Sequence, residues 1–280
     1  MIVSFQGEIG AFSEQAVASA FPEKNPEVLP KPSFRSVFDA LSSGECDRAV
    51  LPIENSLFGS VHANYDLLRE RDVRILDEVY LRVVHHLMAL PGNSIDNIRQ
   101  VFSHPQALGQ CAEYLETHMQ HAEAIPAYDT AGAAKMVAQN GDRTAAAIAS
   151  DAAAAEYGLE ILAHGIESNH QNYTRFLVLA RDSDSPPPPV GERVKTSIVY
   201  AMKRNVPGAL FKALAVFALR DLDLYKIESR PLVGSPFEYL FYLDFGGSVS
   251  EEPVQRALAH LSEIAAYMKV LGSYERGRRE

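Results

Sequence analysis

A hydroxyl and a permanent cation, Thr174 and Arg175, are neighbours in the stretch HQNYTRFLVL, directly before an apolar run. That run, Phe176 to Leu179, is typical of a strand buried inside a sheet. A hydroxyl can donate a hydrogen bond, and a guanidinium can hold a carboxylate through two parallel hydrogen bonds. The pair therefore indicates either a strand end with a surface arginine or a site that receives an anion.

Four other segments place polar side chains where a strand-like run gives way to a helix: FQGEIGAFSEQA, LPIENSLFGSV, FSHPQALGQC and AYDTAGAA. Each can be read as a turn or helix cap, with Ser13 as the expected cap of a helix over 13–21, or as a ligand contact. Ligands dock at strand ends in open α/β sheets, so convergence on one cleft is the more economical interpretation. The candidate contacts are Glu54, Asn55, Ser56, Ser60, His104, Gln106, Asp129 and Thr130.

Composition excludes several classes of function. The net charge of -10 argues against nucleic acid, which needs a basic surface. No basic leader and no apolar run of about 18 residues is visible, so we expect a cytoplasmic protein without a membrane partner. Cys46 and Cys111 form no CxxC pair, and GxSxG, HExxH and P-loop patterns are missing. We therefore expect acid–base and electrostatic chemistry without a metal or cofactor.

The four consecutive prolines in DSDSPPPPVGER, residues 182–193, predict a semi-rigid linker. Before it, strand-like runs such as IVSF, RAVLP, RVVHHLMAL (82–90) and QVFS alternate with amphipathic helices. This alternation predicts an α/β domain with mostly parallel sheets and two lobes around a cleft. After the linker, the order β-α-β-β-α-β within about 85 residues predicts a ferredoxin-like domain.

Seven motifs then occur in a fixed order: GAFSEQA, PIENSLFGSV, SHPQALGQC, DTAGAA, NYTRF, PGALFKAL and KIESRP. The first five resemble the motif series of prephenate dehydratases, and the last two resemble the effector motifs of the ACT domain in such enzymes. The resemblance implies a monofunctional form whose catalytic domain, 1–181, is similar to type 2 periplasmic binding proteins. Its lobes would be 1–80 plus 165–181, and 81–164, with the linker at 182–193 and the ACT regulatory domain at 194–280.

The resemblance also implies the reaction: prephenate loses water and carbon dioxide to give phenylpyruvate, a step in L-phenylalanine biosynthesis. Thr174 matches the family's essential threonine, and we expect it to hydrogen-bond the leaving hydroxyl, with the proton coming from water or from a neighbouring acid such as Glu54 or His104. Arg175 is expected to clamp a substrate carboxylate, although strand alternation sends it and Thr174 to opposite faces, where it can brace a loop instead. The expected substrate contacts are Asn55, Ser56, Ser60, His104, Gln106, Thr130 and Phe176.

For the C-terminal domain, the resemblance implies feedback regulation by L-phenylalanine and a homodimer or homotetramer formed through ACT domains. The helix that opens after NVPG would hold the effector's carboxylate, and Glu228 its amine. The expected effector contacts are Asn205, Gly208, Ala209, Leu210, Glu228, Ser229 and Arg230. Two alternatives remain open at this point: an arogenate dehydratase, and a non-catalytic amino acid sensor.

Overall fold

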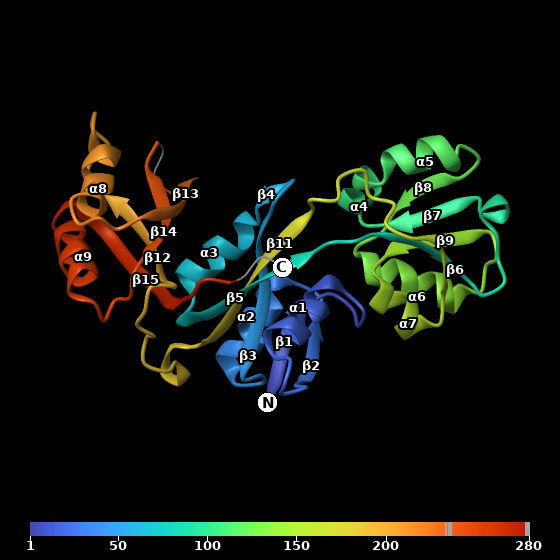
Figure 1. Ribbon diagram of the computed structural model, residues 1–280, viewed down its shortest axis with the longest axis horizontal. Helices are drawn as coiled ribbons and strands as arrows, with labels where there is room; N and C mark the ends of the chain where they lie inside the picture. Colours follow the sequence, from blue (N-terminus) through green and yellow to red (C-terminus); the bar gives the residue numbers. More distant parts are fainter. Residues whose placement is uncertain (233, 235–236, 278–280) are drawn as a thin grey trace. The chain divides into compact units, whose positions relative to one another are not determined.

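The computed structural model describes residues 1–232, 234 and 237–277 (Figure 1). The chain forms two compact units. The first consists of Met1–Val61 and Val79–Phe176, and the second of His62–Glu78 and the described residues from Leu177 onward. The last three residues of the predicted 194–280 domain lie outside the described residues. The sequence-based division placed 62–78 in the first lobe, whereas the contacts group it with the C-terminal part.

The first sheet has the order β2-β1-β3-β11-β5, with β4 paired to β3 (blue to yellow in Figure 1). Its strands are β1 (Ile2–Gln6), β2 (Glu27–Lys31), β3 (Arg48–Asn55), β4 (Gly59–Ser60), β5 (Val73–Arg82) and β11 (Tyr173–Arg181). Strand β1 runs parallel to β2 and β3. Helices α1 (Phe12–Ala20) and α2 (Phe34–Ser43) pack on β1 and β3 and bury their apolar faces there.

The second lobe, green in Figure 1, is built on a sheet of order β10-β6-β9-β7-β8. Its strands are β6 (His86–Ala89), β7 (Gln100–Ser103), β8 (Glu123–Pro126), β9 (Ala145–Ala149) and β10 (Glu160–Ala163). Its helices are η1 (Ile95–Asn97), α4 (Pro105–Gln110), α5 (Ala112–His118), α6 (Thr130–Asn140) and α7 (Asp151–Tyr157). The alanines of β9 are all buried, and their small side chains let α6 pack closely on this strand.

Two local expectations are wrong. The segment 82–90 is not one strand, because β5 ends at Arg82 and β6 begins at His86. Between them, the N–H groups of Val83 and His85 donate to the Asn172 carbonyl and the Glu167 carboxylate instead of to a neighbouring strand. The second sheet is mixed rather than mostly parallel, since β6 runs antiparallel to both β9 and β10.

The C-terminal part contains β12 (Val194–Met202), α8 (Ala209–Ala218), β13 (Leu224–Pro231), β14 (Tyr239–Gly246), α9 (Glu252–Ile264) and β15 (Ala265–Glu275). Its antiparallel sheet has the order β13-β14-β12-β15, which confirms the predicted ferredoxin-like arrangement. Tyr200, Phe217, Phe245 and Leu261 form the centre of its core. In the predicted linker, η2 (Asp182–Asp184) is followed by residues without helix or strand up to 193.

Helix α3 (His62–Glu70) packs on β15 within the second unit. The Lys269 ammonium donates to the carbonyls of Leu68, Arg69 and Arg71, at distances of 3.1, 3.2 and 2.5 Å. The last carbonyls of a helix have no partner within the helix, so this lysine satisfies them. These bonds explain why 62–78 groups with the C-terminal residues. Within the described chain, no helix is long and apolar enough to span a membrane.

Candidate active site

A cavity of about 650 Å³ lies in the first unit and is lined by residues from both lobes. Loops that follow β1, β3, β7 and β8 reach it, together with the start of β11. The structure brings eight of the candidate residues to its wall: Asn55, Ser60, His104, Gln106, Asp129, Thr130, Thr174 and Phe176. Three other expected residues, Glu54, Ser56 and Arg175, are not among those that line it.

Thr174 is buried at the start of β11 and is held by an amide. The Nδ2 of Asn55 donates to the Thr174 Oγ1 at 2.9 Å. Within the part of the chain that the structure describes, Thr174 Oγ1 makes no other hydrogen bond to the protein. A hydroxyl that accepts a hydrogen bond keeps its own hydrogen for a different acceptor. Thr174 is therefore oriented as a donor beside the cavity.

The orientation of Asn55 follows from its neighbours. Its Oδ1 accepts from the backbone N–H of Leu57 at 2.9 Å and of Phe58 at 3.1 Å. Backbone N–H groups can only donate, so the amide oxygen must face them and the Nδ2 must face Thr174. The next residue, Ser56, makes a different contribution: its Oγ donates to the Gln171 carbonyl at 2.8 Å. Ser56 thus fixes the loop to the chain before β11, and it does not cap a helix.

Arg175 and Glu54 lie together away from the cavity wall. The Arg175 Nη1 is 3.8 Å from the Glu54 Oε2, and the Arg175 side chain is 6% exposed. Successive side chains of a strand point to opposite faces, so Thr174 at the cavity sends Arg175 the other way. In this conformation Arg175 braces the end of β3, which is the alternative that the sequence left open.

The cavity wall combines apolar side chains, such as Phe12 and Phe34, with polar ones, and few of the polar ones are charged. Among the described residues that line it, none is Lys or Arg. Neutral donors are supplied by the side-chain amides of Gln6, Gln106 and Gln110. Helix α1 also starts at the wall, with Ala11 as an N-cap that offers no side-chain oxygen. The expected cap, Ser13, lies inside the helix, so the first-turn N–H groups keep their positive end toward the cavity.

Two histidines line the cavity, and burial lowers the pKa of both. The His104 Nδ1 accepts from the Gln106 N–H at 3.3 Å, so His104 caps α4. A neutral imidazole that accepts at Nδ1 carries its hydrogen on Nε2. The His85 Nε2 lies 2.5 Å from the Gln110 Oε1. His85 was not among the expected site residues, because the segment 82–90 was predicted to be one long strand.

The loop from Gly7 to Gly10 connects the two lobes beside the cavity. The Glu8 carboxylate accepts from the Tyr128 hydroxyl at 2.8 Å and from the Lys135 ammonium at 2.9 Å. These hydrogen bonds, that of Lys135 above all, lower the pKa of Glu8. Asp129 caps α6 through Gly132 N–H and also accepts from the Glu8 N–H. The helix-cap interpretation of Asp129 is confirmed, and the same side chain joins the lobes.

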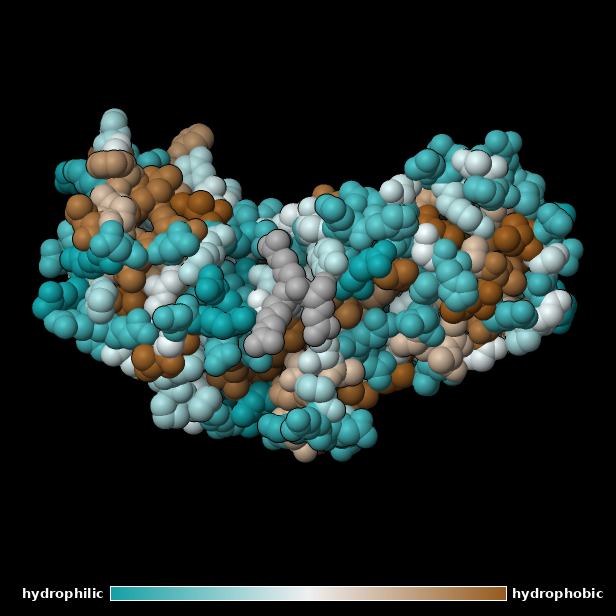
Figure 2. All heavy atoms as spheres, viewed as in Figure 1, coloured by the Kyte–Doolittle hydropathy of each residue, from teal (hydrophilic) through white to brown (hydrophobic). Residues whose placement is uncertain are grey.

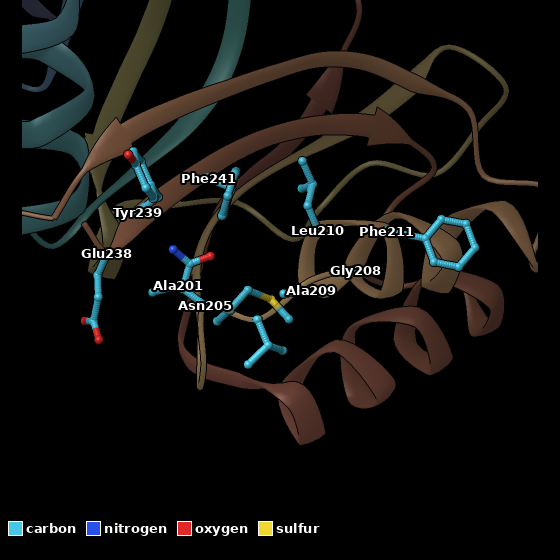
Figure 3. Close-up of a pocket in the computed structure, with 11 residues that line it drawn as sticks. Ala201, Asn205, Gly208, Ala209, Leu210, Phe211, Glu238, Tyr239 and Phe241 are labelled. Atoms are coloured by element: carbon cyan, nitrogen blue, oxygen red, sulfur yellow. The ribbon is translucent and has the colours of Figure 1, made fainter.

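A second cavity of about 330 Å³ lies in the C-terminal domain, at the first turn of α8 (Figure 3). Of the expected effector residues it contains Asn205, Gly208, Ala209 and Leu210. Figure 3 shows that Tyr239 and Phe241 of β14 complete its wall, together with Glu238, which the sequence did not single out. Leu210 is exposed, so its side chain is accessible at this cavity.

The three remaining effector candidates, Glu228, Ser229 and Arg230, do not line this cavity. The Glu228 Oε1 lies 3.3 Å from the His62 Nε2, and the Arg230 Nη2 donates to the Asp66 Oδ2 at 2.9 Å. Side chains alternate between the two faces of β13, so Glu228 and Arg230 lie on the same face. Their partners, His62 and Asp66, are one turn apart on α3. In this conformation Glu228 and Arg230 bind α3, and Glu228 does not face the second cavity.

Comparisons with known proteins agree with this architecture. A family model described as prephenate dehydratase matches residues 3–184. Arogenate dehydratase/prephenate dehydratase 2, chloroplastic, of Arabidopsis thaliana is 49% identical over 97% of this chain and 72% of its own length. The prephenate dehydratase of Arthrobacter aurescens, solved in complex with L-Phe, has a TM-score of 0.89 at 32% identity over 99% of this chain and 90% of that chain. GqqA, described as a novel type of quorum quenching acylase, has a TM-score of 0.87 at 34% identity over 98% of both chains.

Two α/β lobes around a cavity, followed by a ferredoxin-like domain and matched by the family model, define an enzyme of the dehydratase type, a carbon–oxygen lyase. The chain belongs to the prephenate dehydratase family. The named Arabidopsis relative is chloroplastic, and the cytoplasmic location expected for this chain stays a prediction.

Proposed function

We propose that this enzyme converts prephenate to phenylpyruvate, with Thr174 as the hydrogen-bond donor to the leaving hydroxyl. The observation that carries the proposal is the Asn55–Thr174 hydrogen bond of 2.9 Å, which turns the Thr174 hydrogen toward other acceptors at the cavity wall. A threonine hydroxyl is too weak an acid to give up its proton at neutral pH. Thr174 therefore stabilises the departing oxygen, and a proton from a second group completes the formation of water.

In the reaction, the bond between the ring carbon and its carboxylate breaks and releases carbon dioxide. The electron pair of that bond enters the ring, the carbon–oxygen bond to the hydroxyl breaks, and the ring becomes aromatic. The oxygen leaves with the electrons of its bond and takes one proton to become water. Negative charge thus develops on the oxygen in the transition state, and a preoriented hydrogen bond is most effective there. His104 lines the cavity, and its imidazolium form would supply this proton from Nε2, because the neutral imidazole is too weak an acid to do so.

The two substrate carboxylates would be held largely by neutral groups. Side-chain amides of Gln6, Gln106 and Gln110 and the uncapped start of α1 are the donors at the wall. Arg175, for which we predicted a clamp, lies against Glu54 and could reach the substrate only after leaving that partner. A wall whose described residues include no Lys or Arg also suits the chemistry, because a tightly paired cation would stabilise the carboxylate that must depart.

Arogenate is the second candidate substrate, and the name of the Arabidopsis relative includes both activities. The two substrates differ in the side chain, which carries a keto group in prephenate and an amine in arogenate. The test is to supply each to the purified protein and to quantify phenylpyruvate and phenylalanine by chromatography. Thr174→Ala should lower kcat by about 10²-fold or more, and Thr174→Ser should keep much more activity. Equal and small losses in both variants would refute the assigned role.

We also propose that the C-terminal domain is an ACT domain that binds L-phenylalanine and regulates the enzyme. The cavity at α8 supports this, since a helix start without a side-chain cap can receive a carboxylate and Glu238 can receive an ammonium group. The Arthrobacter relative was solved with L-Phe bound. The test is the melting temperature and the initial rate with and without saturating L-phenylalanine, with D-phenylalanine as the control. Unchanged values with the L isomer would refute the proposal.

Self-association through this domain remains part of the proposal. Figure 2 shows apolar side chains gathered at the surface over α8. Phe211 and Leu219 are 74% and 77% exposed, and Ile227 of β13 is 45% exposed. Exposed apolar patches of this kind mark interaction surfaces. A homodimer or homotetramer should appear in sedimentation velocity, and Phe211→Glu should shift the distribution toward the monomer.

A further inference from the structure

Asn172 is buried two residues before Thr174 and is the first residue of the NYTRF motif, but it was not among the expected site residues. We propose that Asn172 is a positioning residue for the dehydration. It holds the Asn55 amide so that the amide's second hydrogen points at Thr174, and it thereby directs the Thr174 hydrogen toward the substrate. This inference rests on the proposed role of Thr174.

The backbone around Asn172 is fixed on every side. The Asn172 carbonyl accepts from the Val83 N–H at 2.8 Å. On either side of it, Ser56 bonds to the Gln171 carbonyl and to both backbone groups of Tyr173. Its side chain is fully buried, so it has no freedom to swing toward solvent. The Asn172 amide is therefore held in place beside Asn55, and the hydrogen bond from the Asn55 Nδ2 selects its Oδ1 as the atom that faces Asn55.

Because the Asn55 amide is planar, the position of the Asn172 Oδ1 also fixes the direction of the Asn55 hydrogen that points at Thr174. The Asn55 Nδ2 donates to the Asn172 Oδ1 at 2.8 Å and to the Thr174 Oγ1 at 2.9 Å. The two hydrogens of a planar amide nitrogen lie about 120° apart in one plane, so fixing the direction of one fixes the direction of the other. With Asn172 as acceptor for the first hydrogen, the second must point at Thr174. Without it, that Asn55 Nδ2–H loses its partner in the protein, and the Asn55 amide is free to turn away from Thr174.

Stability alone does not account for an asparagine at this place. The Asn172 Nδ2 has no hydrogen-bond partner among the described residues, although it is buried. An unpaired buried donor is unfavourable, so a side chain with only the acceptor would serve the fold better. Asn172 uses its acceptor on Asn55 and on no other described side chain. The Asn172 Oδ1 is therefore the atom that we expect to position the Asn55 amide for the reaction.

The test compares variants that keep or remove this acceptor. Asn172→Asp retains an oxygen at the same place, and kcat should stay within about threefold of wild type. Asn172→Leu removes it at similar size, and kcat should fall about tenfold, the value of one hydrogen bond. KM should change by less than about twofold in Asn172→Leu, because Asn172 does not line the cavity. Asn140→Leu is the matched control, since Asn140 is an exposed asparagine at the end of α6, away from the hydrogen bonds around Asn172, and its kcat should equal that of wild type.

A double-mutant cycle separates positioning from a structural role. If Asn172 acts through Thr174, adding Asn172→Leu to Thr174→Ala should cause no further loss in kcat. A further tenfold loss in that background would overturn the inference while the role of Thr174 stood. A Thr174→Ala enzyme with wild-type kcat would instead overturn the proposed function. Melting temperatures check folding, and Asn172→Ala replaces the leucine variant if the latter does not fold.

Discussion

Asn55→Asp is the sharpest perturbation of the cavity, because it changes one atom of the side chain from a donor to an acceptor and leaves the shape intact. The Oδ1 of the new aspartate can still accept from the N–H groups of Leu57 and Phe58, so the loop after β3 keeps its hydrogen bonds. The other oxygen would face the Asn172 Oδ1, but the Asn172 amide can turn over and offer its otherwise unpaired Nδ2. We therefore expect the variant to fold.

The consequence falls on Thr174. Its Oγ1 lies 2.9 Å from the position of the new oxygen, and a hydroxyl at that distance from a carboxylate donates to it. Before Thr174 can donate to the substrate it must break this hydrogen bond to a charged group, which is worth about 1.5–3 kcal/mol. A barrier raised by that amount lowers kcat by about 10- to 150-fold.

The assay is steady-state release of phenylpyruvate, with kcat and KM determined separately and melting temperature measured on the same preparations. A new negative charge beside a dianionic substrate can also raise KM, so the prediction concerns kcat. Asn169→Asp is the control, because it adds the same charge at an exposed asparagine of the chain before β11. A folded Asn55→Asp enzyme whose kcat stays within about threefold of wild type would refute the argued direction of the Thr174 hydrogen.

Three further outcomes follow from the contacts. Partners on the second lobe lower the pKa of Glu8, whose side chain is 30% exposed. The ionised Glu8 therefore contributes to the free energy of unfolding above its ordinary pKa of 4.5, and this contribution is lost as the pH falls through the lower pKa of the folded protein. Glu8→Gln should therefore lower the melting temperature by about 2–4 °C at pH 7, and the difference from wild type should vanish in acid. Gly10→Ala should destabilise by about 1–3 kcal/mol in urea titrations, since its Cβ would lie 2.7 Å from the Ala153 Cα at a φ of +86°. Gly141→Ala, at a φ of +67° in open space, should show the smaller strain effect alone. Lys269→Met leaves the final carbonyls of α3 without their donor and should speed amide hydrogen exchange there, by about 10-fold or more; unchanged exchange would contradict the capping role.

The local pattern of the sequence was sufficient for most of the fold. Alternation of apolar strands and amphipathic helices predicted the α/β lobes, and the order of elements after the prolines predicted the ferredoxin-like sheet. The prediction of one strand over 82–90 was wrong because the apolar residues continue through the stretch where the chain crosses from one lobe to the other. Its N–H groups there bond to Asn172 and Glu167, about 85 positions along the chain, and no local pattern reports such partners.

For the cavity, the sequence determined which types of side chain stand at the ends of the strands, including Asn55, His104 and Thr174. Only the tertiary structure decided which member of each polar pair faces the cavity. Because side chains alternate along β11, Thr174 faces the cavity and Arg175 lies against Glu54. The same alternation along β13 places Glu228 against α3 and not at the second cavity. The physical reason is that hydrogen bonds such as Asn55–Thr174 and Asn55–Asn172 join residues more than a hundred positions apart, so their existence depends on how the strands pair.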